Sequence, residues 1–190
     1  MTPDYRRAEM PELVADLEAA ATEVEREFAP LTAAQLNWKP NPEEWSVAQC
    51  LEHTAMTDER YIPQFDALLR GEKRRTPAER LPFLPTLSAR VLIRSLDPSA
   101  PARLSTTPAF YPTASALDAS VVARLLAVQA RLIEQMHALQ TVDAARQRVT
   151  SPFAGFVAYS ALDACRIIAA HERVHLNQAR RVLASPGFPA

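Results

Sequence analysis

The chain has 190 residues, which is enough for one domain with a sizeable core. Its 48% hydrophobic and 23% charged residues are typical of a globular protein, and a net charge of −1 argues against nucleic-acid or anionic-membrane partners. Three glycines against sixteen prolines argue against glycine-rich β folds and against the glycine-rich loops that hold phosphates.

No apolar run is long enough to span a bilayer, and the segment "MTPDYRRAEM" lacks an apolar signal region. We therefore expect a cytoplasmic protein with no membrane partner. The two cysteines, Cys50 and Cys165, belong to no zinc or redox motif. We interpret them as small buried residues.

The first predicted element is an amphipathic helix over 9–29, where apolar residues recur every three or four positions and Pro30 ends the pattern. A proline-broken loop with a short helical turn at most follows. The next helix begins at Ser46, which forms an S-x-x-Q capping box with Gln49. Its inner face continues to Leu68, and Pro63 should kink it.

The stretch 71–115 is the least regular part of the chain and contains only a short amphipathic helix, "LSARVLIRSL". Two long helices follow, predicted at 116–140 and 157–184. Four amphipathic helices with a long connection predict an all-α fold, a four-helix bundle formed by a single domain over 1–190. Long loops in compact domains are usually functional or disordered, so 71–115 is a natural pocket wall or lid.

The last helix contains the motif "HERVH", and its apolar face passes through His171, His175 and Gln178. Burying such groups without partners costs about 1–3 kcal/mol each. One interpretation is a hydrogen-bonded pair of core histidines. Two histidines four residues apart on the buried face favour the other, a bound metal.

The same motif fits H-E-x-x-H, in which zinc proteases use the glutamate as a general base. A protease is excluded, because "LNQARR" follows His175 and the rest of the chain offers neither histidine nor glutamate as a third ligand. Glu172 is a candidate catalytic base, yet it lies about 90° from the core face, and we expect it at the surface.

A third ligand must then come from upstream. His137 lies more than 90° from the apolar stripe of its helix and is interpreted as a surface residue. His53 lies at the border of an apolar face, where it can point toward a neighbouring helix. A ferritin-like di-iron site is rejected, because Glu134 points away from the apolar face of its helix.

Two stretches resemble the DinB-like superfamily. "LTAAQLNWKPNPEEWSVAQCLEHTAMTDERYI" is similar to the start of such a domain, with a Trp-Ser pair before the second helix and a histidine about two turns later. "SPFAGFVAYSALDACRIIAAHERVHLNQARRVL" is similar to its end, with an H-x-x-x-H-x-x-Q signature. The resemblance is weakest through 71–115.

The resemblance implies a bundle with a crossover connection, often a homodimer, and a divalent metal, zinc or nickel, bound by His53, His171 and His175. It also implies a small-molecule substrate. Several members are thiol-dependent enzymes, namely bacillithiol transferases, mycothiol-dependent maleylpyruvate isomerases and glutathione transferases. Others are described only as metal-dependent hydrolases, and many have no known activity. Arg173 matches an arginine that is common between the two histidines in this family. One interpretation of Glu172 is therefore that its match to the protease motif H-E-x-x-H is a coincidence.

The sequence does not choose between a metal-dependent thiol transferase and a hydrolase. A different class, a non-catalytic metal-binding or stress-related helical bundle, is the alternative. Gln178 is expected to be buried and hydrogen-bonded beside the site. It should not be a direct ligand, because amides are poor zinc ligands beside imidazoles.

Overall fold

The computed structural model describes residues 3–80, 84–96, 111–112 and 116–189. These residues are mostly helical, which confirms the all-α prediction. The elements follow one another as α1 (Met10–Phe28), α2 (Ala33–Asn37), α3 (Val47–Glu59), α4 (Ile62–Leu69), the 3₁₀ turn η1 (Ala78–Arg80), α5 (Leu84–Ser95), α6 (Ser120–Leu139), β1 (Arg148–Thr150), β2 (Ala158–Ser160) and α7 (Ala161–Leu183).

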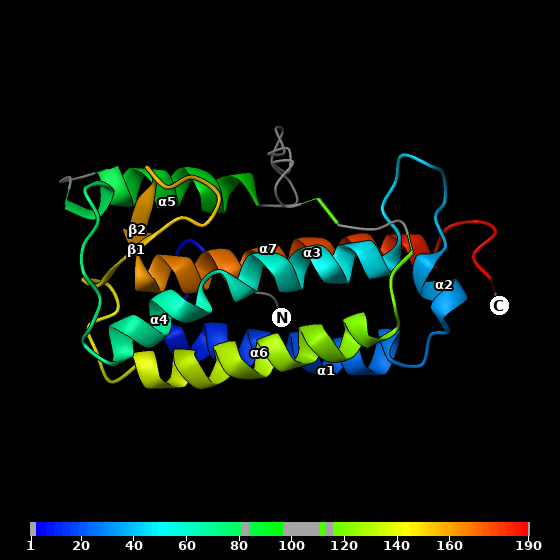
Figure 1. The fold of residues 1–190 in the computed structure, drawn as a ribbon, viewed down its shortest axis with the longest axis horizontal. Helices are drawn as coiled ribbons and strands as arrows, with labels where there is room; N and C mark the ends of the chain where they lie inside the picture. The colour runs from blue at the N-terminus through cyan, green and yellow to red at the C-terminus, as the bar shows by residue number, and fades with distance from the viewer. Residues whose placement is uncertain (1–2, 81–83, 97–110, 113–115, 190) are drawn as a thin grey trace.

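Four helices pack side by side around a common core (Figure 1). Both α1 and α3 contact α6 and α7, so α1 and α3 lie on opposite corners of the bundle. The connection from α4 to α6 includes α5, which packs against α7 and β2. The middle of α7 is therefore covered by α1, α3 and α5, and its side chains are enclosed on several faces.

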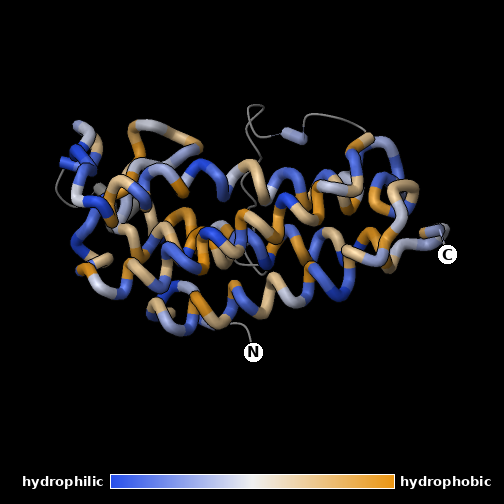
Figure 2. The backbone as a smooth tube through the Cα atoms, turned by 60° about the horizontal axis from the view of Figure 1, so that its bottom comes forward, coloured by the Kyte–Doolittle hydropathy of each residue, from blue (hydrophilic) through white to orange (hydrophobic). Residues whose placement is uncertain are grey.

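The core forms because each long helix carries an apolar stripe along its inner side. Figure 2 shows hydrophobic and hydrophilic positions alternating along the helices. In α1 the stripe comprises side chains that are at most 1% exposed, Leu13, Leu17, Val24 and Phe28 among them. Each large apolar side chain buried in this way stabilises the fold by about 1.5–3 kcal/mol.

The helix start predicted at Ser46 is confirmed. The Ser46 Oγ accepts a hydrogen bond from the Gln49 backbone N–H (3.2 Å), and the Gln49 side chain accepts one from the Ser46 N–H (3.1 Å). The expected kink at Pro63 is instead a break, because α3 ends at Glu59 and α4 begins at Ile62. Proline has no N–H to donate, and here it occupies the first turn of the new helix, where none is needed.

The last helix begins later than predicted. Residues 158–160 form β2, which pairs antiparallel with β1 in the register Arg148↔Ser160. The sequence pattern did not predict a strand there. The hairpin is attached to α4, because the Gln64 side chain both donates to and accepts from the Thr150 backbone (2.9 Å each). Tyr159 and Tyr61 also share a buried hydroxyl–hydroxyl hydrogen bond.

The two cysteines are buried and unpaired, as predicted. None of the described helices combines the length and the apolar character that crossing a membrane requires. The prediction of a lid or pocket wall at 71–115 falls partly on positions 81–83, 97–110 and 113–115, which lie outside the described residues.

Candidate metal centre

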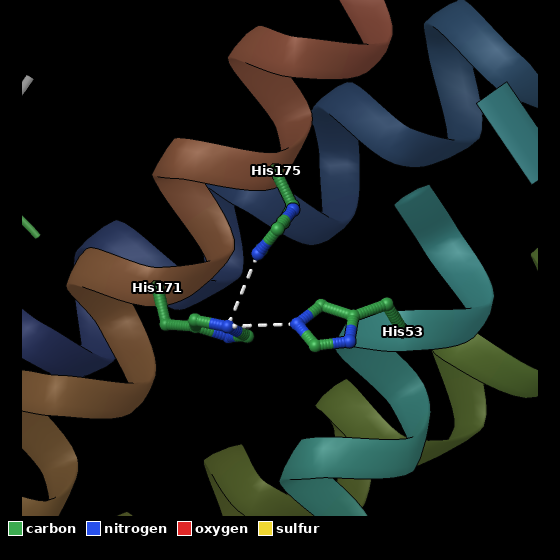
Figure 3. A group of neighbouring side chains, drawn as sticks. All are labelled: His53, His171 and His175. Carbon is green, nitrogen blue, oxygen red and sulfur yellow. Dashed lines mark hydrogen bonds between the residues drawn. The ribbon is translucent and has the colours of Figure 1, made fainter. Parts of the chain in front are cut away.

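Three histidine side chains from two helices meet in the structure. His53 comes from α3, and His171 and His175 come from successive turns of α7 (Figure 3). The Nε2 atom of His171 lies 3.2 Å from that of His53 and 3.1 Å from that of His175. Ligand atoms of all three lie within 4.8 Å of one another, and no other such cluster of His, Cys, Asp or Glu occurs in the described parts of the chain.

The packing of α3 against α7 brings these rings together. The capping box fixes the start of α3, and His53 follows Ser46 by about two turns. His171 and His175 are one turn apart, so both rings face α3. The border position of His53, which the sequence left ambiguous, points directly at α7.

The two short contacts of His171 are not both ordinary hydrogen bonds. A neutral imidazole nitrogen has either one hydrogen to donate or one lone pair to accept with, so the single Nε2 of His171 forms such a bond with one neighbour at a time. Imidazoles bound to one tetrahedral zinc at about 2.0–2.1 Å have nitrogens about 3.3 Å apart. The observed 3.1 and 3.2 Å are close to that spacing, so the residues present fit a metal ion.

The pKa values of His171 and His175, the two histidines on α7, also favour metal binding. Burial, together with the neighbouring imidazoles, lowers the pKa of His171 well below 6.5. Burial and His53 lower the pKa of His175 to about 3. Metal ligands must be deprotonated, so these two side chains are already in the binding form at neutral pH.

Gln178 lies beside the cluster and is hydrogen-bonded as predicted, although it is half-buried and not fully enclosed. Its Oε1 lies 3.0 Å from Nδ1 of His175. An amide oxygen only accepts, so Nδ1 carries the hydrogen and the Nε2 lone pair of His175 faces the other two rings.

Aromatic rings surround the three histidines. Trp45 lies nearly parallel to His175, with an interplanar angle of 19° and 5.8 Å between ring centroids, and its centroid is 5.0 Å from that of His53. Phe153, in the β1–β2 loop, lies 6.2 Å from His171. The hairpin that the sequence analysis missed thus contributes to the surroundings of the site.

The surface position expected for Glu172 is wrong, because its side chain is fully buried. Helix α7 is covered on that face too, and the carboxyl group accepts a hydrogen bond from Gln129 of α6 (2.7 Å). The Asp58 carboxyl of α3 lies against it. Burial raises the pKa of Glu172 to about 7, and burial with the adjacent Glu172 raises that of Asp58.

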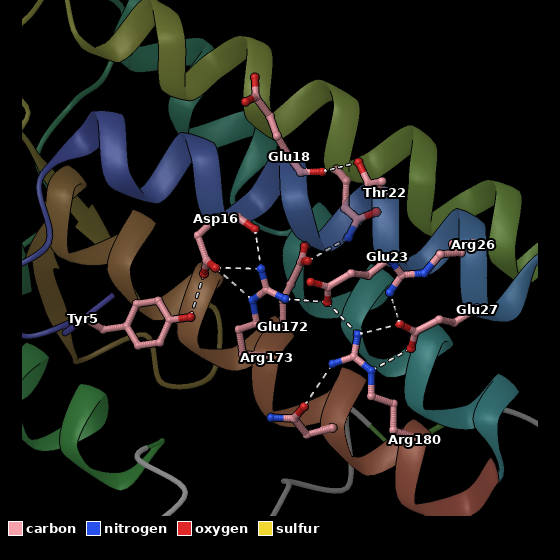
Figure 4. Close-up of polar contacts among 12 residues, drawn as sticks. Tyr5, Asp16, Glu18, Thr22, Glu23, Arg26, Glu27, Glu172, Arg173 and Arg180 are labelled. Carbon is pink, nitrogen blue, oxygen red and sulfur yellow. Dashed lines mark hydrogen bonds and ion pairs between the residues drawn. The ribbon is translucent and has the colours of Figure 1, made fainter. Parts of the chain in front are cut away.

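Arg173 points toward α1 and holds the two helices together (Figure 4). Its guanidinium donates to the Asp16 carboxylate (2.6 Å) and to Glu23 (2.6 Å), while Tyr5 donates to the other Asp16 oxygen (2.6 Å). Arg173 therefore fixes the position of the helix that carries two of the three histidines.

The remaining histidine lies apart from the cluster. His137 is exposed on α6, 3.6 Å from Glu18, as predicted. Asp58 and Gln129 were not among the site residues predicted from the sequence. Their spacing contained a signal, since Asp58 lies one turn after Thr54 and Gln129 one turn after Leu125, both on buried faces.

Comparison with known proteins identifies one family. The family model described as the DinB superfamily matches residues 16–179. This range includes the three histidines and every helix of the bundle except the first residues of α1 and the end of α7. Neither a curated protein nor a solved structure matches this chain.

Proposed function

Since the chain belongs to the DinB superfamily, we propose that it is a metal-dependent enzyme in which His53, His171 and His175 hold one divalent ion. The observation that carries this proposal is that the Nε2 atom of His171 lies 3.2 Å from that of His53 and 3.1 Å from that of His175, with ligand atoms of all three within 4.8 Å of one another. Zinc and nickel are the candidates, since imidazole suits both.

Three protein ligands leave positions open, as in catalytic and not structural metal sites. A metal there would act as a Lewis acid that lowers the pKa of a bound water or thiol. The protein contributes neutral imidazoles, a tautomer of His175 set by Gln178, and the neighbouring rings of Trp45 and Phe153.

For the reaction we propose transfer of a low-molecular-weight thiol to an electrophilic substrate, with hydrolysis as the second possibility. Both use a nucleophile that a metal makes available at neutral pH. Glu172 as a general base stays a prediction. Its carboxyl group contacts Gln129 and Asp58 in the bundle interior, and Glu172→Gln tests the role if activity is lost while metal content is retained.

The test is a thiol screen with the metal-loaded protein. Bacillithiol, mycothiol and glutathione are each offered with an electrophilic acceptor, and ester or amide substrates are offered in parallel. The matched control is His175→Ala, which lacks one proposed ligand and is checked for its helical content by circular dichroism. Turnover that requires both the metal and His175 supports the proposal. A protein that binds metal but turns over none of these substrates would favour a non-catalytic metal-binding bundle.

A further inference from the structure

Trp45 is held in one place between the two helices that carry the histidines. It directly precedes Ser46, whose reciprocal hydrogen bonds with Gln49 fix the start of α3. Its ring contacts His53 of α3 and His175 of α7. The outer side of the indole meets Tyr111 edge-on, at 6.3 Å and 83°. The side chain is thus fixed by its backbone and by rings on two sides.

The orientation of the indole has a chemical consequence. It lies nearly parallel to the His175 ring, so its π face is directed at that imidazole. Coordination to a divalent ion draws electron density from an imidazole and leaves the ring more positive. The face of an indole is the negative end of its quadrupole and attracts positive charge more strongly than the smaller face of phenylalanine.

We propose that Trp45 is a positioning residue for the metal, which fixes the planes of His53 and His175 and stabilises the charge that His175 gains on ligation. This inference rests on the proposed three-histidine site. If Trp45 served only to pack against its neighbours, replacing it would not change the affinity for metal. The proposed role predicts that it does.

The test compares three side chains at one position. Trp45→Phe keeps a smaller aromatic face, and Trp45→Leu keeps apolar bulk without a π face. The dissociation constant for Co²⁺ is measured from its visible absorption for wild type and both variants. Outer residues that orient metal-bound histidines typically contribute about 10–100-fold in affinity. We expect a weakening of about that size for Trp45→Leu and an intermediate one for Trp45→Phe.

The second tryptophan provides the matched control. Trp38 packs edge-on against Phe188 at 5.5 Å and contacts none of the three histidines in the described structure. Trp38→Leu should bind Co²⁺ as wild type does. The Co²⁺ spectrum adds a readout that general loss of stability would not change, because altered ligand planes shift the d–d bands. Trp45→Phe keeps a ring at the position and so keeps the test valid if Trp45→Leu does not fold.

The outcomes separate this inference from the proposed function. If His175→Ala loses Co²⁺ binding while Trp45→Leu binds with wild-type affinity and an unchanged spectrum, the role of Trp45 is refuted and the site stands. Equal losses for Trp45→Phe and Trp45→Leu would also refute the π-face argument. If His175→Ala binds as wild type does, the site and this inference are both refuted.

Discussion

At the scale of single residues, the three histidines differ in how well the sequence predicts them. His171 and His175 were placed together by helix geometry alone, since residues four apart share a face. His53 lay at the border of an apolar face, and only the packing of α3 against α7 places it. Its partner lies 118 positions away in the chain, and no local pattern encodes such a contact.

The triad predicts a clear pattern in mutant proteins. His53→Ala and His175→Ala should each weaken zinc or nickel binding by at least a hundredfold, because each removes one of three ligands. His137→Ala should leave the affinity unchanged, since that side chain is exposed on α6. Competition with a chelating dye measures all three. Retention of wild-type affinity by His53→Ala would mean that the site has at most two ligands on α7.

Glu172 shows where the geometric argument failed. An angle of about 90° from the core face suggested the surface, but α7 has neighbours on several sides. The Glu172 carboxyl group has polar neighbours inside the bundle, because Gln129 donates a hydrogen bond to it and the Asp58 carboxyl lies against it. Three buried oxygens of these side chains have no hydrogen-bond partner in the described structure: Oε1 of Glu172, Oδ2 of Asp58 and Oε1 of Gln129.

These two acids predict a pH effect on stability. Burial raises the pKa of Glu172 from 4.5 to about 7, so the folded chain binds a proton that the unfolded chain has released. The contribution of Glu172 to the free energy of unfolding should therefore fall as pH rises from about 4.5 to 7. The expected size is on the order of 3 kcal/mol, since one pKa unit corresponds to about 1.4 kcal/mol.

The measurement compares wild type with Asp58→Asn/Glu172→Gln in urea, both without metal. Between pH 5 and pH 8, the free energy of unfolding of the variant should rise relative to that of wild type. The comparison of two proteins is needed because His171 and His175 change the stability with pH in the opposite direction to Glu172. Their lowered pKa values make their contribution fall as pH drops below 6.5, equally in both proteins. Parallel stability curves for the two proteins would show that the acids carry no extra proton.

At the scale of elements, the sequence predicted best where the signals are local. The periodic apolar residues of α1 predicted both ends of that helix to within one residue, and the capping box predicted the start of α3. The break before Pro63 was misjudged as a kink. The hairpin was missed because each strand has three residues and is held by distant groups, the Gln64 side chain and the Tyr61 hydroxyl.

The contact between α1 and α7 is the element-scale feature most open to test. Arg173→Ala would leave the Asp16 carboxylate, which is 8% exposed, without its main partner. Removing one member of a fully buried pair costs about 3–5 kcal/mol. Because Glu23 is partly exposed, we expect about 2 kcal/mol here, after allowing for solvent screening.

Urea unfolding measures the effect, with Arg146→Ala as the control. Arg146 also forms an ion pair, with Asp143, but its side chain is largely exposed, and its removal should change stability little. Because α7 carries two of the three proposed ligands, Arg173→Ala should weaken metal binding as well. Equal stability of the two variants would mean that the network around Asp16 contributes no more than a surface ion pair.

At the scale of the whole molecule, the metal proposal links folding to function. The three proposed ligands lie on α3 and α7, which are packed together in the folded bundle. A metal that binds only the folded state stabilises it, by about 2.7 kcal/mol at a hundred times the dissociation constant. The family match over residues 16–179 includes α3, most of α7 and all three histidines, so the proposed site lies within the part of the chain that defines the family.

X-ray absorption at the zinc or nickel edge, on protein loaded with one equivalent of metal, tests the central claim most directly. It reports the number and type of the atoms bound to the ion. We predict three imidazole nitrogens at about 2.0–2.1 Å and at least one further oxygen or nitrogen from water or buffer. Failure to take up a stoichiometric metal, a shell containing sulfur, or a shell with fewer than three imidazoles would contradict the account.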